Sequence, residues 1–340
     1  MSRVCIIAEA GVNHNGSLEV AKKMAYVAKE AGADIVKFQT FNATDLVTSE
    51  AKMAPYQIGN MGIESSQFHM LKELMLSRQE FIELKKYCEE IGIDFLSTPF
   101  DIGSIEFLEE IGCKKWKIPS GEITNYPYLL KIAKTGKPII MSTGMCYLKD
   151  VTAALKVLRE NMAGDVTLLH CTTDYPTQYD EVNLRAMLTM KNQTGLDVGY
   201  SDHTLGTEVA IAAVSLGATV IEKHFTLSRS MQGPDHKASL EPDEFKMLVK
   251  QIRNIERALG QDTKEVMVSE RENLLIARKS IVAKRNIIMG ETFSEFNLTT
   301  KRPGTGISPM RWLDIIGKKA SRNYKKDELI DEEESCGDKY

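Results

Sequence analysis

The 340-residue sequence has no long apolar run and little excess of charge of either sign. No stretch approaches the roughly 20 apolar residues that a helix needs to cross a bilayer, so we expect no association with a membrane. The 43 lysines and arginines against 47 aspartates and glutamates give a net charge of −4, which excludes the basic surface of a nucleic-acid-binding protein. The opening MSRVCIIAEAG leads directly into a strand pattern, and its apolar part is too short for a secretion signal.

The sequence also lacks closely spaced cysteines. The six cysteines are scattered, without C-x-x-C or zinc-type spacing: Cys5, Cys88, Cys113, Cys146, Cys171 and Cys336. Isolated thiols are typical of a reducing compartment, so we predict a cytoplasmic protein with free cysteines. The content of 43% hydrophobic and 26% charged residues is ordinary for a globular protein. A chain of this length can form one large domain and one small one.

What the sequence does contain is a regular alternation of short β-branched runs and longer amphipathic segments such as SLEVAKKMAYVAKEAGA. Eight strands alternating with helices in about 230 residues predict an α/β fold, a (β/α)₈ TIM barrel. A doubly wound sheet is the alternative. It would use a G-x-G-x-x-G turn after its first strand, and the sequence there is EAGVNHNGS.

Two segments depart from this alternation. Residues 41–78 follow the second strand as a long polar loop and then a short helix, which is typical of a lid or substrate loop. After the last barrel helix, a charged segment leads into a block of short strands and turns. We therefore expect a catalytic barrel over residues 1–262, a linker over 263–279, a small, mostly β module over 280–332 and a disordered tail over 333–340.

Polar residues recur where the predicted strands end. In a (β/α)₈ barrel, chemistry gathers at the carboxyl ends of the strands. Buried polar groups at these ends must bond to one another or to a ligand, so their recurrence predicts a polar ligand site. The strand-end residues are Glu9, Lys37, Gln39, Thr98, Lys117, Ser120, Glu122, Ser142, Thr143, His170, Tyr175, Ser201, His203, Glu222 and His224.

Lys37 and Lys117 both lie inside apolar runs, where an unpaired ammonium is unfavourable. One interpretation is a Schiff-base lysine with a lowered pKa, as in a pyruvate aldolase. The other is a clamp for phosphate and carboxylate groups. Four hydroxyls at the strand ends favour the clamp because they match the acceptors of a phosphate: Thr98, Ser120, Ser142 and Ser201. A Schiff-base site would need one lysine and gives the hydroxyls no role.

His203 and His224 end consecutive strands, so their side chains can converge across one strand spacing of about 5 Å. Two imidazoles, with a carboxylate such as Glu9 and open positions, would suit a labile divalent ion. The histidines favour Mn²⁺ over Mg²⁺. A hydrogen-bonded pair of core histidines is the alternative.

Together these motifs resemble a known family. AEAGVNHNGSL, VKFQT, STPFD, KIPSGEITN, STGM, LLHCTTDYPT, GYSDHT, EKHFTL and GPDHKASLEP resemble the bacterial sialic acid synthase family, in order from about residue 3 to residue 330. The block KRPGTGIS resembles that family's C-terminal antifreeze-like (SAF) domain. The resemblance implies a transferase that condenses phosphoenolpyruvate with an open-chain N-acetylated mannose-type sugar to give a nine-carbon 2-keto acid. It also implies a divalent metal, Mn²⁺ with Mg²⁺ or Co²⁺ as alternatives, and a domain-swapped homodimer.

The resemblance further implies roles for individual residues. The metal ligands would be His203 and His224. The phosphoenolpyruvate pocket would comprise Lys37, Thr98, Lys117, Ser120, Ser142 and Ser201. The catalytic residues would be Glu9, Glu122 and Tyr175. The sugar-binding residues would be Gln39, Tyr56, Gln57, Tyr175, Asp235 and Arg302, with Arg302 reaching the active site of the partner subunit.

Several details resemble the legionaminic acid branch, whose sugar is 2,4-diacetamido-2,4,6-trideoxymannose. The second strand ends in KFQTF where the sialic acid branch has a KHQTH-type pattern, and the lid KMAPYQ lacks a Pro-Gly-Asn. An apolar Phe38 or Phe41 near the sugar would suit the missing 6-hydroxyl, although Phe38 in the core is the alternative. N-acetylneuraminate synthesis from N-acetylmannosamine is a second candidate. A non-catalytic module that binds ice or polysaccharide is disfavoured by the charges in KRNIIMGETFSEFNLTTKRP.

Overall fold

The computed structural model describes residues 3–62 and 66–331, except for the side chains of Pro55 and Tyr56. The chain divides into two compact units, Met1–Gly260 and Gln261–Tyr340. The tail expected at 333–340 lies outside the described residues. Within those residues, no helix is both long enough and apolar enough to cross a membrane.

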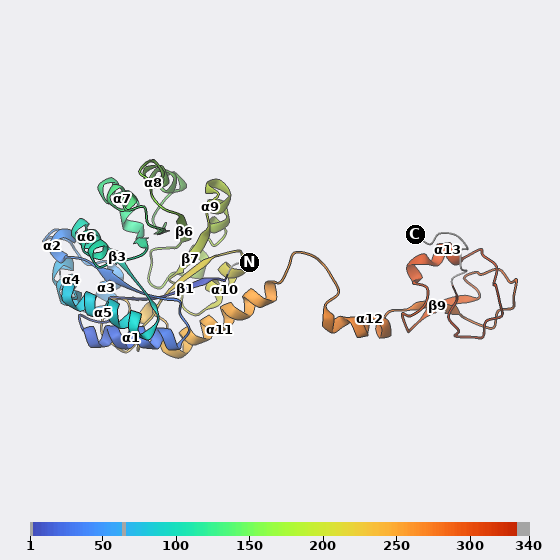
Figure 1. Cartoon of the computed structure of the whole chain (residues 1–340). Coiled ribbons are helices and arrows are strands. Elements are labelled where there is room, and N and C mark those ends of the chain that lie inside the picture. Colours follow the sequence, from blue (N-terminus) through green and yellow to red (C-terminus); the bar gives the residue numbers. More distant parts are fainter. Residues whose placement is uncertain (1–2, 63–65, 332–340) are drawn as a thin grey trace. The chain divides into compact units, whose positions relative to one another are not determined.

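The first unit is a parallel (β/α)₈ barrel, which confirms the predicted fold (Figure 1). The sheet order is β3-β2-β1-β8-β7-β6-β5-β4, and β3 also lies against β4, which closes the sheet. The strands are β1 (Cys5–Gly11), β2 (Ile35–Thr40), β3 (Asp94–Pro99), β4 (Trp116–Ile118), β5 (Ile139–Ser142), β6 (Val166–His170), β7 (Val198–Asp202) and β8 (Val220–His224).

Amphipathic helices cover the outside of the barrel. They are α1 (Leu18–Glu30), α5 (Arg78–Ile91), α6 (Ile102–Glu110), α7 (Tyr126–Ala133), α8 (Leu148–Glu160), α9 (Ala186–Thr194), α10 (Glu208–Ser215) and α11 (Pro242–Leu259). Their ends follow local chemistry. The hydroxyl of Ser77 caps the amino end of α5 by accepting from the Glu80 N–H. Gly92, at φ 74°, ends the same helix in the left-handed conformation that glycine adopts readily.

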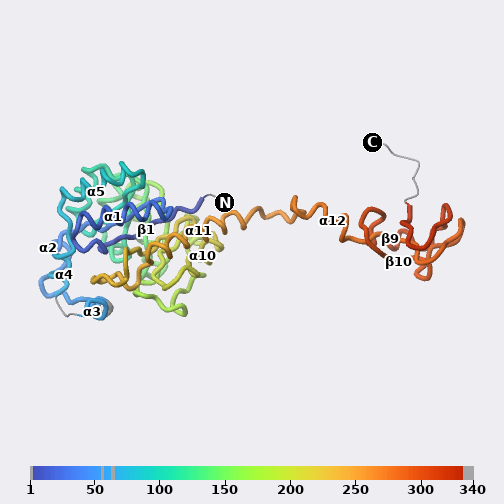
Figure 2. Tube along the Cα trace, turned by 90° about the horizontal axis from the view of Figure 1, so that it is seen from below, coloured from blue at the N-terminus to red at the C-terminus, as the bar shows by residue number. Residues whose placement is uncertain are grey.

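The insertion at residues 41–78 differs from the polar loop and short helix that the sequence predicts. Its described residues, 41–62 and 66–78, contain three short helices, α2 (Ala43–Leu46), α3 (Pro55–Met61) and α4 (Gln67–Leu74), which gather at one edge of the barrel (Figure 2). Phe41 anchors them in an apolar cluster with Met53, Met70 and Leu74. Burial of these side chains gives the insertion an apolar core of its own.

The interior of the barrel has an apolar floor beneath a polar layer. The floor consists of Ile7, Ile35, Leu96, Ile140, Leu169 and Val220. Alternate residues of a strand point to the same face, so the next inward positions follow two residues later. These positions are polar on five strands: Glu9, Lys37, Thr98, Ser142 and Glu222. The polar layer therefore lies at the carboxyl ends of the strands.

The second unit is small and mostly irregular. It contains α12 (Arg271–Ala277), the antiparallel strands β9 (Ser280–Ala283) and β10 (Leu298–Lys301), and α13 (Trp312–Ile315). Its own apolar core includes Ile281, Phe293 and Tyr324. The segment expected as a linker, 263–279, thus holds a helix.

Candidate active site

A cavity of about 270 Å³ opens at the carboxyl ends of the barrel strands. It brings together eleven of the residues predicted from the sequence: Glu9, Lys37, Gln39, Thr98, Lys117, Ser120, Ser142, Tyr175, Ser201, His203 and His224. They come from most of the strands of the barrel, so only the closed sheet assembles them. Glu222, which the sequence places among the strand-end residues without a specific role, also lines the cavity.

Two lysines and two glutamates form a buried charged cluster, which we call the cavity cluster (Glu9, Lys37, Lys117 and Glu222). Lys37 Nζ lies 2.8 Å from Glu9 Oε2 and 3.7 Å from Glu222 Oε2. Lys117 Nζ lies 3.1 Å from Glu222 Oε1. The cluster has no net charge when all four groups are ionised. An anionic ligand that recruits the lysines must therefore compete with the two carboxylates.

Burial and pairing shift the pKa values of the cavity cluster in different directions. Burial raises the pKa of Glu9, and Glu222 adds to this effect. Burial acts in the same sense on Glu222, but Lys117 and Lys37 outweigh it and lower the pKa of Glu222 to about 2. Burial lowers the pKa of Lys117, whereas for Lys37 the two carboxylates overcome burial and raise the pKa. Strongly perturbed groups in a cavity are typical of a functional site.

Hydroxyls surround the lysines as the anion clamp requires. Thr98 Oγ1 accepts a hydrogen bond of 3.1 Å from Lys37, and Ser120 Oγ accepts one of 2.9 Å from the Gly144 N–H. Ser142 Oγ is buried and has no hydrogen-bond partner among the described residues. Buried hydroxyls are rarely left unpaired, so this one points to a ligand that supplies an acceptor or a donor.

Gly144 allows the close approach of its N–H to Ser120. A Cβ at this position would lie 2.3 Å from Thr173 Oγ1 and 3.0 Å from Ser120 Oγ. No larger residue fits here without displacing a group that lines the cavity.

His203 and His224 lie side by side, with ring centroids 5.5 Å apart. His203 Nδ1 is 2.6 Å from the Thr172 carbonyl oxygen, which can only accept, so Nδ1 carries the proton and Nε2 keeps its lone pair. His224 Nδ1 is buried with no partner among the described residues. Burial lowers the pKa of His203 to about 4 and that of His224 well below its ordinary value. Both imidazoles are therefore neutral at pH 7, the form that binds metal ions.

These residues fit a divalent ion held by two histidines. Within the described ranges, no group of three or more histidine, cysteine, aspartate or glutamate side chains is arranged to hold a metal. Glu9, considered from the sequence as a third ligand, pairs with Lys37 and accepts a hydrogen bond of 3.2 Å from Gln39. A bound ion would complete its coordination with water or substrate oxygens.

Tyr175 and Asp235 are two of the residues predicted to bind the sugar. The Tyr175 ring packs 4.3 Å from the His203 ring and edge-on to His224 at 5.6 Å. Asp235 is buried, and burial, followed by the nearby charge of Glu9, raises its pKa to about 7. It does not belong to the described residues that line the cavity.

The remaining predicted residues lie elsewhere. Gln57 Oε1 accepts from the Ala54 N–H and so caps α3, and the Tyr56 side chain is outside the described part of the structure. Glu122 accepts a hydrogen bond from Asn125 in the turn after Ser120, next to the cavity-lining Gly121. Arg302 belongs to the second unit, where its Nε donates to the Ala277 carbonyl at 3.0 Å.

The expectation that Phe38 or Phe41 approaches the sugar is wrong for Phe38. The Phe38 side chain is fully buried on the outer face of the barrel sheet. Its ring stacks on that of Phe95, with the ring centroids 6.0 Å apart. Phe38 adjoins Lys37 in β2 and therefore points away from the interior. Phe41 packs edge-on against Phe100 and lines a different, smaller cavity.

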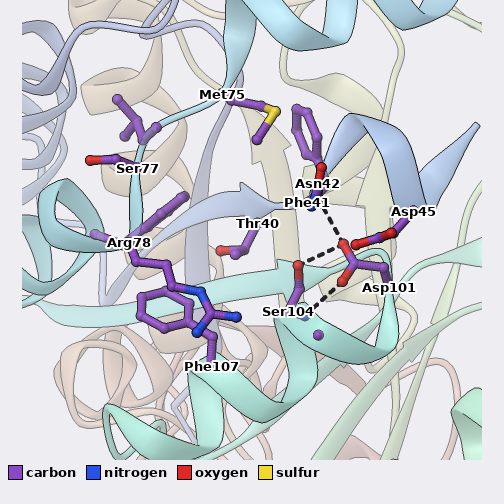
Figure 3. Close-up of a pocket in the computed structure, with 13 residues that line it drawn as sticks. Thr40, Phe41, Asn42, Asp45, Met75, Ser77, Arg78, Asp101, Ser104 and Phe107 are labelled. Carbon is purple, nitrogen blue, oxygen red and sulfur yellow. Dashed lines mark hydrogen bonds between the residues drawn. The ribbon is translucent and has the colours of Figure 1, made fainter.

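That smaller cavity, of about 160 Å³, has polar groups that already bond to one another (Figure 3). Asp101 accepts from the Asn42 N–H at 2.8 Å and from the Ser104 N–H and Oγ, each at 2.7 Å. Arg78 lies over the Phe107 ring at 5.2 Å. These contacts cap α6 and hold the insertion, so this cavity is structural.

Comparison with known families agrees with this geometry. The NeuB family model matches residues 24–264, and the SAF domain model matches residues 278–334. Together these two matches define a class of protein: a TIM barrel whose cavity is lined by lysines, glutamates and histidines, followed by a SAF domain. The chain belongs to the NeuB family, and the resemblance seen in the sequence is confirmed.

Individual relatives narrow the comparison. The chain is 55% identical to the N,N'-diacetyllegionaminic acid synthase of Campylobacter jejuni, covering 98% of this chain and 100% of the relative. It is 47% identical to the enzyme of the same name from Legionella pneumophila, over 94% of this chain and 90% of that protein. Among solved structures, it resembles an N-acetylneuraminic acid synthetase of Leptospira borgpetersenii in complex with citrate, at 34% identity and a TM-score of 0.71. That match covers 80% of this chain and 90% of the other.

Proposed function

We propose that the protein condenses phosphoenolpyruvate with open-chain 2,4-diacetamido-2,4,6-trideoxymannose and water to give the nine-carbon 2-keto acid N,N'-diacetyllegionaminic acid and phosphate. The observation that carries this proposal is the cavity in which two buried lysines adjoin a pair of neutral histidines. The full-length similarity to two N,N'-diacetyllegionaminic acid synthases supports the choice of sugar.

The lysine side of the cavity would bind phosphoenolpyruvate. Lys37 and Lys117 would exchange their carboxylate partners for the phosphate and carboxylate of the substrate, since ammonium groups bind phosphate strongly. The surrounding hydroxyls would complete its hydrogen bonds: Thr98, Ser120, Ser142 and Ser201. Ser142 supports this role most directly because its hydroxyl has no partner among the described residues.

His203 and His224 would hold a divalent ion, for which we propose Mn²⁺ with Mg²⁺ or Co²⁺ as alternatives. When bound, the ion would supply Lewis-acid polarisation of the sugar aldehyde. The carbonyl of Thr172 keeps Nδ1 of His203 protonated, and so keeps Nε2 of His203 free for this purpose. The Tyr175 ring, which packs against His203 at an interplanar angle of 38°, would contact a sugar bound beside the imidazole pair.

The reaction forms one carbon–carbon bond and breaks one carbon–oxygen bond. The methylene carbon of phosphoenolpyruvate attacks the aldehyde carbon, and the aldehyde oxygen takes up a proton and becomes a hydroxyl. Water adds to the cationic carbon that bears the phosphate, and the phosphate leaves with its bridging oxygen, which gives the ketone. Of the two protons that the water loses, one supplies the new hydroxyl and the other leaves with the phosphate. We assign Glu9 and Glu222 to the handling of this water and to stabilising the positive charge, because their carboxylates face the cavity.

Further roles expected from the sequence remain proposals. Glu122 would assist catalysis from the turn beside the cavity. Gln39, Tyr56, Gln57 and Asp235 would contact the sugar. Arg302 would enter the cavity of a partner subunit in a domain-swapped homodimer. We also propose a cytoplasmic location, in keeping with the scattered cysteines.

A phosphate-release assay with purified protein tests the function. With phosphoenolpyruvate and Mn²⁺, we expect kcat/KM for the diacetamido-trideoxy sugar to exceed that for N-acetylmannosamine by about 10²-fold, since a site shaped for particular polar groups discriminates strongly. Mass spectrometry of the product verifies the condensation. Comparable kcat/KM values for both sugars would contradict the choice of sugar. If neither sugar leads to release of phosphate, the proposed reaction itself is contradicted.

A further inference from the structure

We propose that Asp202, Lys223 and Thr204 form a positioning clamp that fixes the imidazoles of His203 and His224 relative to each other. This clamp lies on the faces of β7 and β8 opposite to the cavity. The inference rests on the proposed role of the two histidines as metal ligands, and it assigns a task to a buried ion pair that the reaction does not otherwise use.

The clamp is a fully buried cross-strand contact. The strands pair in register, with Ser201 opposite Glu222 and Asp202 opposite Lys223. Lys223 Nζ lies 2.7 Å from Asp202 Oδ2, and both side chains have an exposed fraction of 0%. Because alternate residues face opposite sides, this pair points away from the cavity while its neighbours in the chain point into it.

Both members of the ion pair also hold Thr204, the residue that follows His203. The Thr204 N–H and Oγ1 donate to Asp202 Oδ1 at 2.9 and 2.7 Å. The Thr204 carbonyl oxygen accepts a hydrogen bond of 2.6 Å from Lys223 Nζ. The backbone after His203 is therefore tied both to its own strand and to the strand that carries His224.

The ring of His203 is fixed separately, through the hydrogen bond from Nδ1 to the Thr172 carbonyl. Backbone and ring are thus held by different contacts, which come from the loop after β6 and from β7 and β8. Together these contacts determine where Nε2 of His203 points with respect to His224. Residues that orient metal ligands in this way commonly change metal affinity 10–100-fold when they are replaced.

An ion pair is not needed here for stability alone. Replacing a buried ion pair by apolar residues of similar volume is often neutral or stabilising. Leucine and methionine could pack in place of Asp202 and Lys223, but they could not bond to the three polar groups of Thr204. The structure therefore separates the two explanations, because apolar replacements would retain packing and lose positioning.

The test is the double variant Asp202→Leu/Lys223→Met, examined as the full-length protein after metal removal. Titration with Mn²⁺, with free Mn²⁺ measured by electron paramagnetic resonance, is expected to give a Kd at least about 10-fold weaker than wild type. The thermal midpoint without metal should fall, because the buried polar groups of Thr204 lose their partners, so the control and the Thr204 variant below separate this loss from the loss of positioning. A Kd equal to that of wild type overturns the proposal, as does a wild type that binds no Mn²⁺.

The matched control removes another ion pair, at the opposite ends of the strands. Arg253 Nη2 lies 2.8 Å from Asp34 Oδ2, and Asp34→Leu/Arg253→Met is expected to leave the Mn²⁺ Kd unchanged. An equal weakening in the control would show a general loss of rigidity and overturn the clamp.

If the double variant fails to fold, a single substitution at Thr204 tests the proposal instead. Thr204→Val removes one donor to Asp202 and keeps the ion pair, so it should weaken Mn²⁺ binding in the same direction by a smaller factor. A Kd for Thr204→Val equal to that of wild type would overturn the proposal. If the wild-type protein binds Mn²⁺ but condenses no sugar, the proposed function is refuted. The test of the clamp still holds in that case, because it measures metal binding and not the condensation.

Discussion

The cavity cluster faces the interior of the barrel and the positioning clamp faces away from it, with β8 contributing a residue to each. Both regions are buried, yet they differ in how well their polar atoms are bonded. In the clamp, both oxygens of Asp202 accept hydrogen bonds and Lys223 donates two. Beside the cavity cluster, Ser142 Oγ and His224 Nδ1 are buried without a partner among the described residues. Burial of charge is thus common to both regions. Incomplete hydrogen bonding is what distinguishes the region expected to bind ligands.

The largest expected effect is that of metal removal. Dialysis against EDTA should lower kcat by at least about 10³-fold, because Lewis-acid stabilisation of the transition state contributes several kcal/mol. Addition of Mn²⁺ should restore activity, as measured by phosphate release. Retained activity after thorough chelation, together with trapping of pyruvate on Lys37 or Lys117 by borohydride, would instead support the Schiff-base interpretation.

Equivalent lysine replacements in the two regions should have their largest effects on different quantities, catalysis in one and stability in the other. Lys37→Met should lower kcat/KM for phosphoenolpyruvate by about 10²–10³-fold through loss of an anion-binding group. Lys223→Met leaves the Asp202 carboxylate buried and unpaired, so it should lower the free energy of unfolding by about 3–5 kcal/mol. Steady-state kinetics and urea unfolding measure the two effects. Equal changes in both variants would remove the distinction between the regions.

Asp235→Asn should stabilise the protein in a pH-dependent way. The pKa of Asp235 is about 7 in the folded protein, against an ordinary value of 3.8. The folded protein therefore retains a proton that the unfolded chain releases, and stability is lost as pH rises from about 4 to 7. The asparagine variant avoids this loss, which amounts to about 4 kcal/mol at most. Urea unfolding at pH 8 should give a higher free energy of unfolding for the variant than for wild type, and urea unfolding at pH 4 should give almost no difference.

Arg302→Ala should have the smallest effect of these five changes. If Arg302 reaches the sugar of a partner subunit, its removal should raise the KM for the sugar by about 10-fold, the worth of one charged hydrogen bond. The KM for phosphoenolpyruvate and the stability should stay near wild type. Lys301→Ala, at the neighbouring position, is the control. Unchanged kinetics for Arg302→Ala would refute the cross-subunit role.

Much of the site could be predicted from the sequence because strand alternation is a local property. Ser201 and His203 share a face two residues apart, as do Glu222 and His224. The same rule places Phe38 outside, since it lies between the inward-facing Lys37 and Gln39. The expectation that Phe38 meets the sugar therefore disregarded information that the sequence already contained.

Other features depend on barrel closure and could not be read locally. Glu222 pairs with Lys117, 105 residues earlier in the chain, because β8 and β4 face each other across the interior. No sequence spacing encodes that contact. Glu122 was predicted by counting beyond a strand, but β4 ends at Ile118 and a 3₁₀ turn follows, so the alternation of faces no longer applies.

The apolar floor of the barrel has a consequence for solvent. Ile7, Ile35, Leu96 and their neighbours close the interior below the charged layer, so water reaches Lys37 and Lys117 from the carboxyl ends of the strands. A substrate that covers this mouth traps a small, fixed set of water molecules with the four charged groups. The water consumed in each turnover would then be drawn from that trapped set, and the bulk solvent would replenish it only when product leaves.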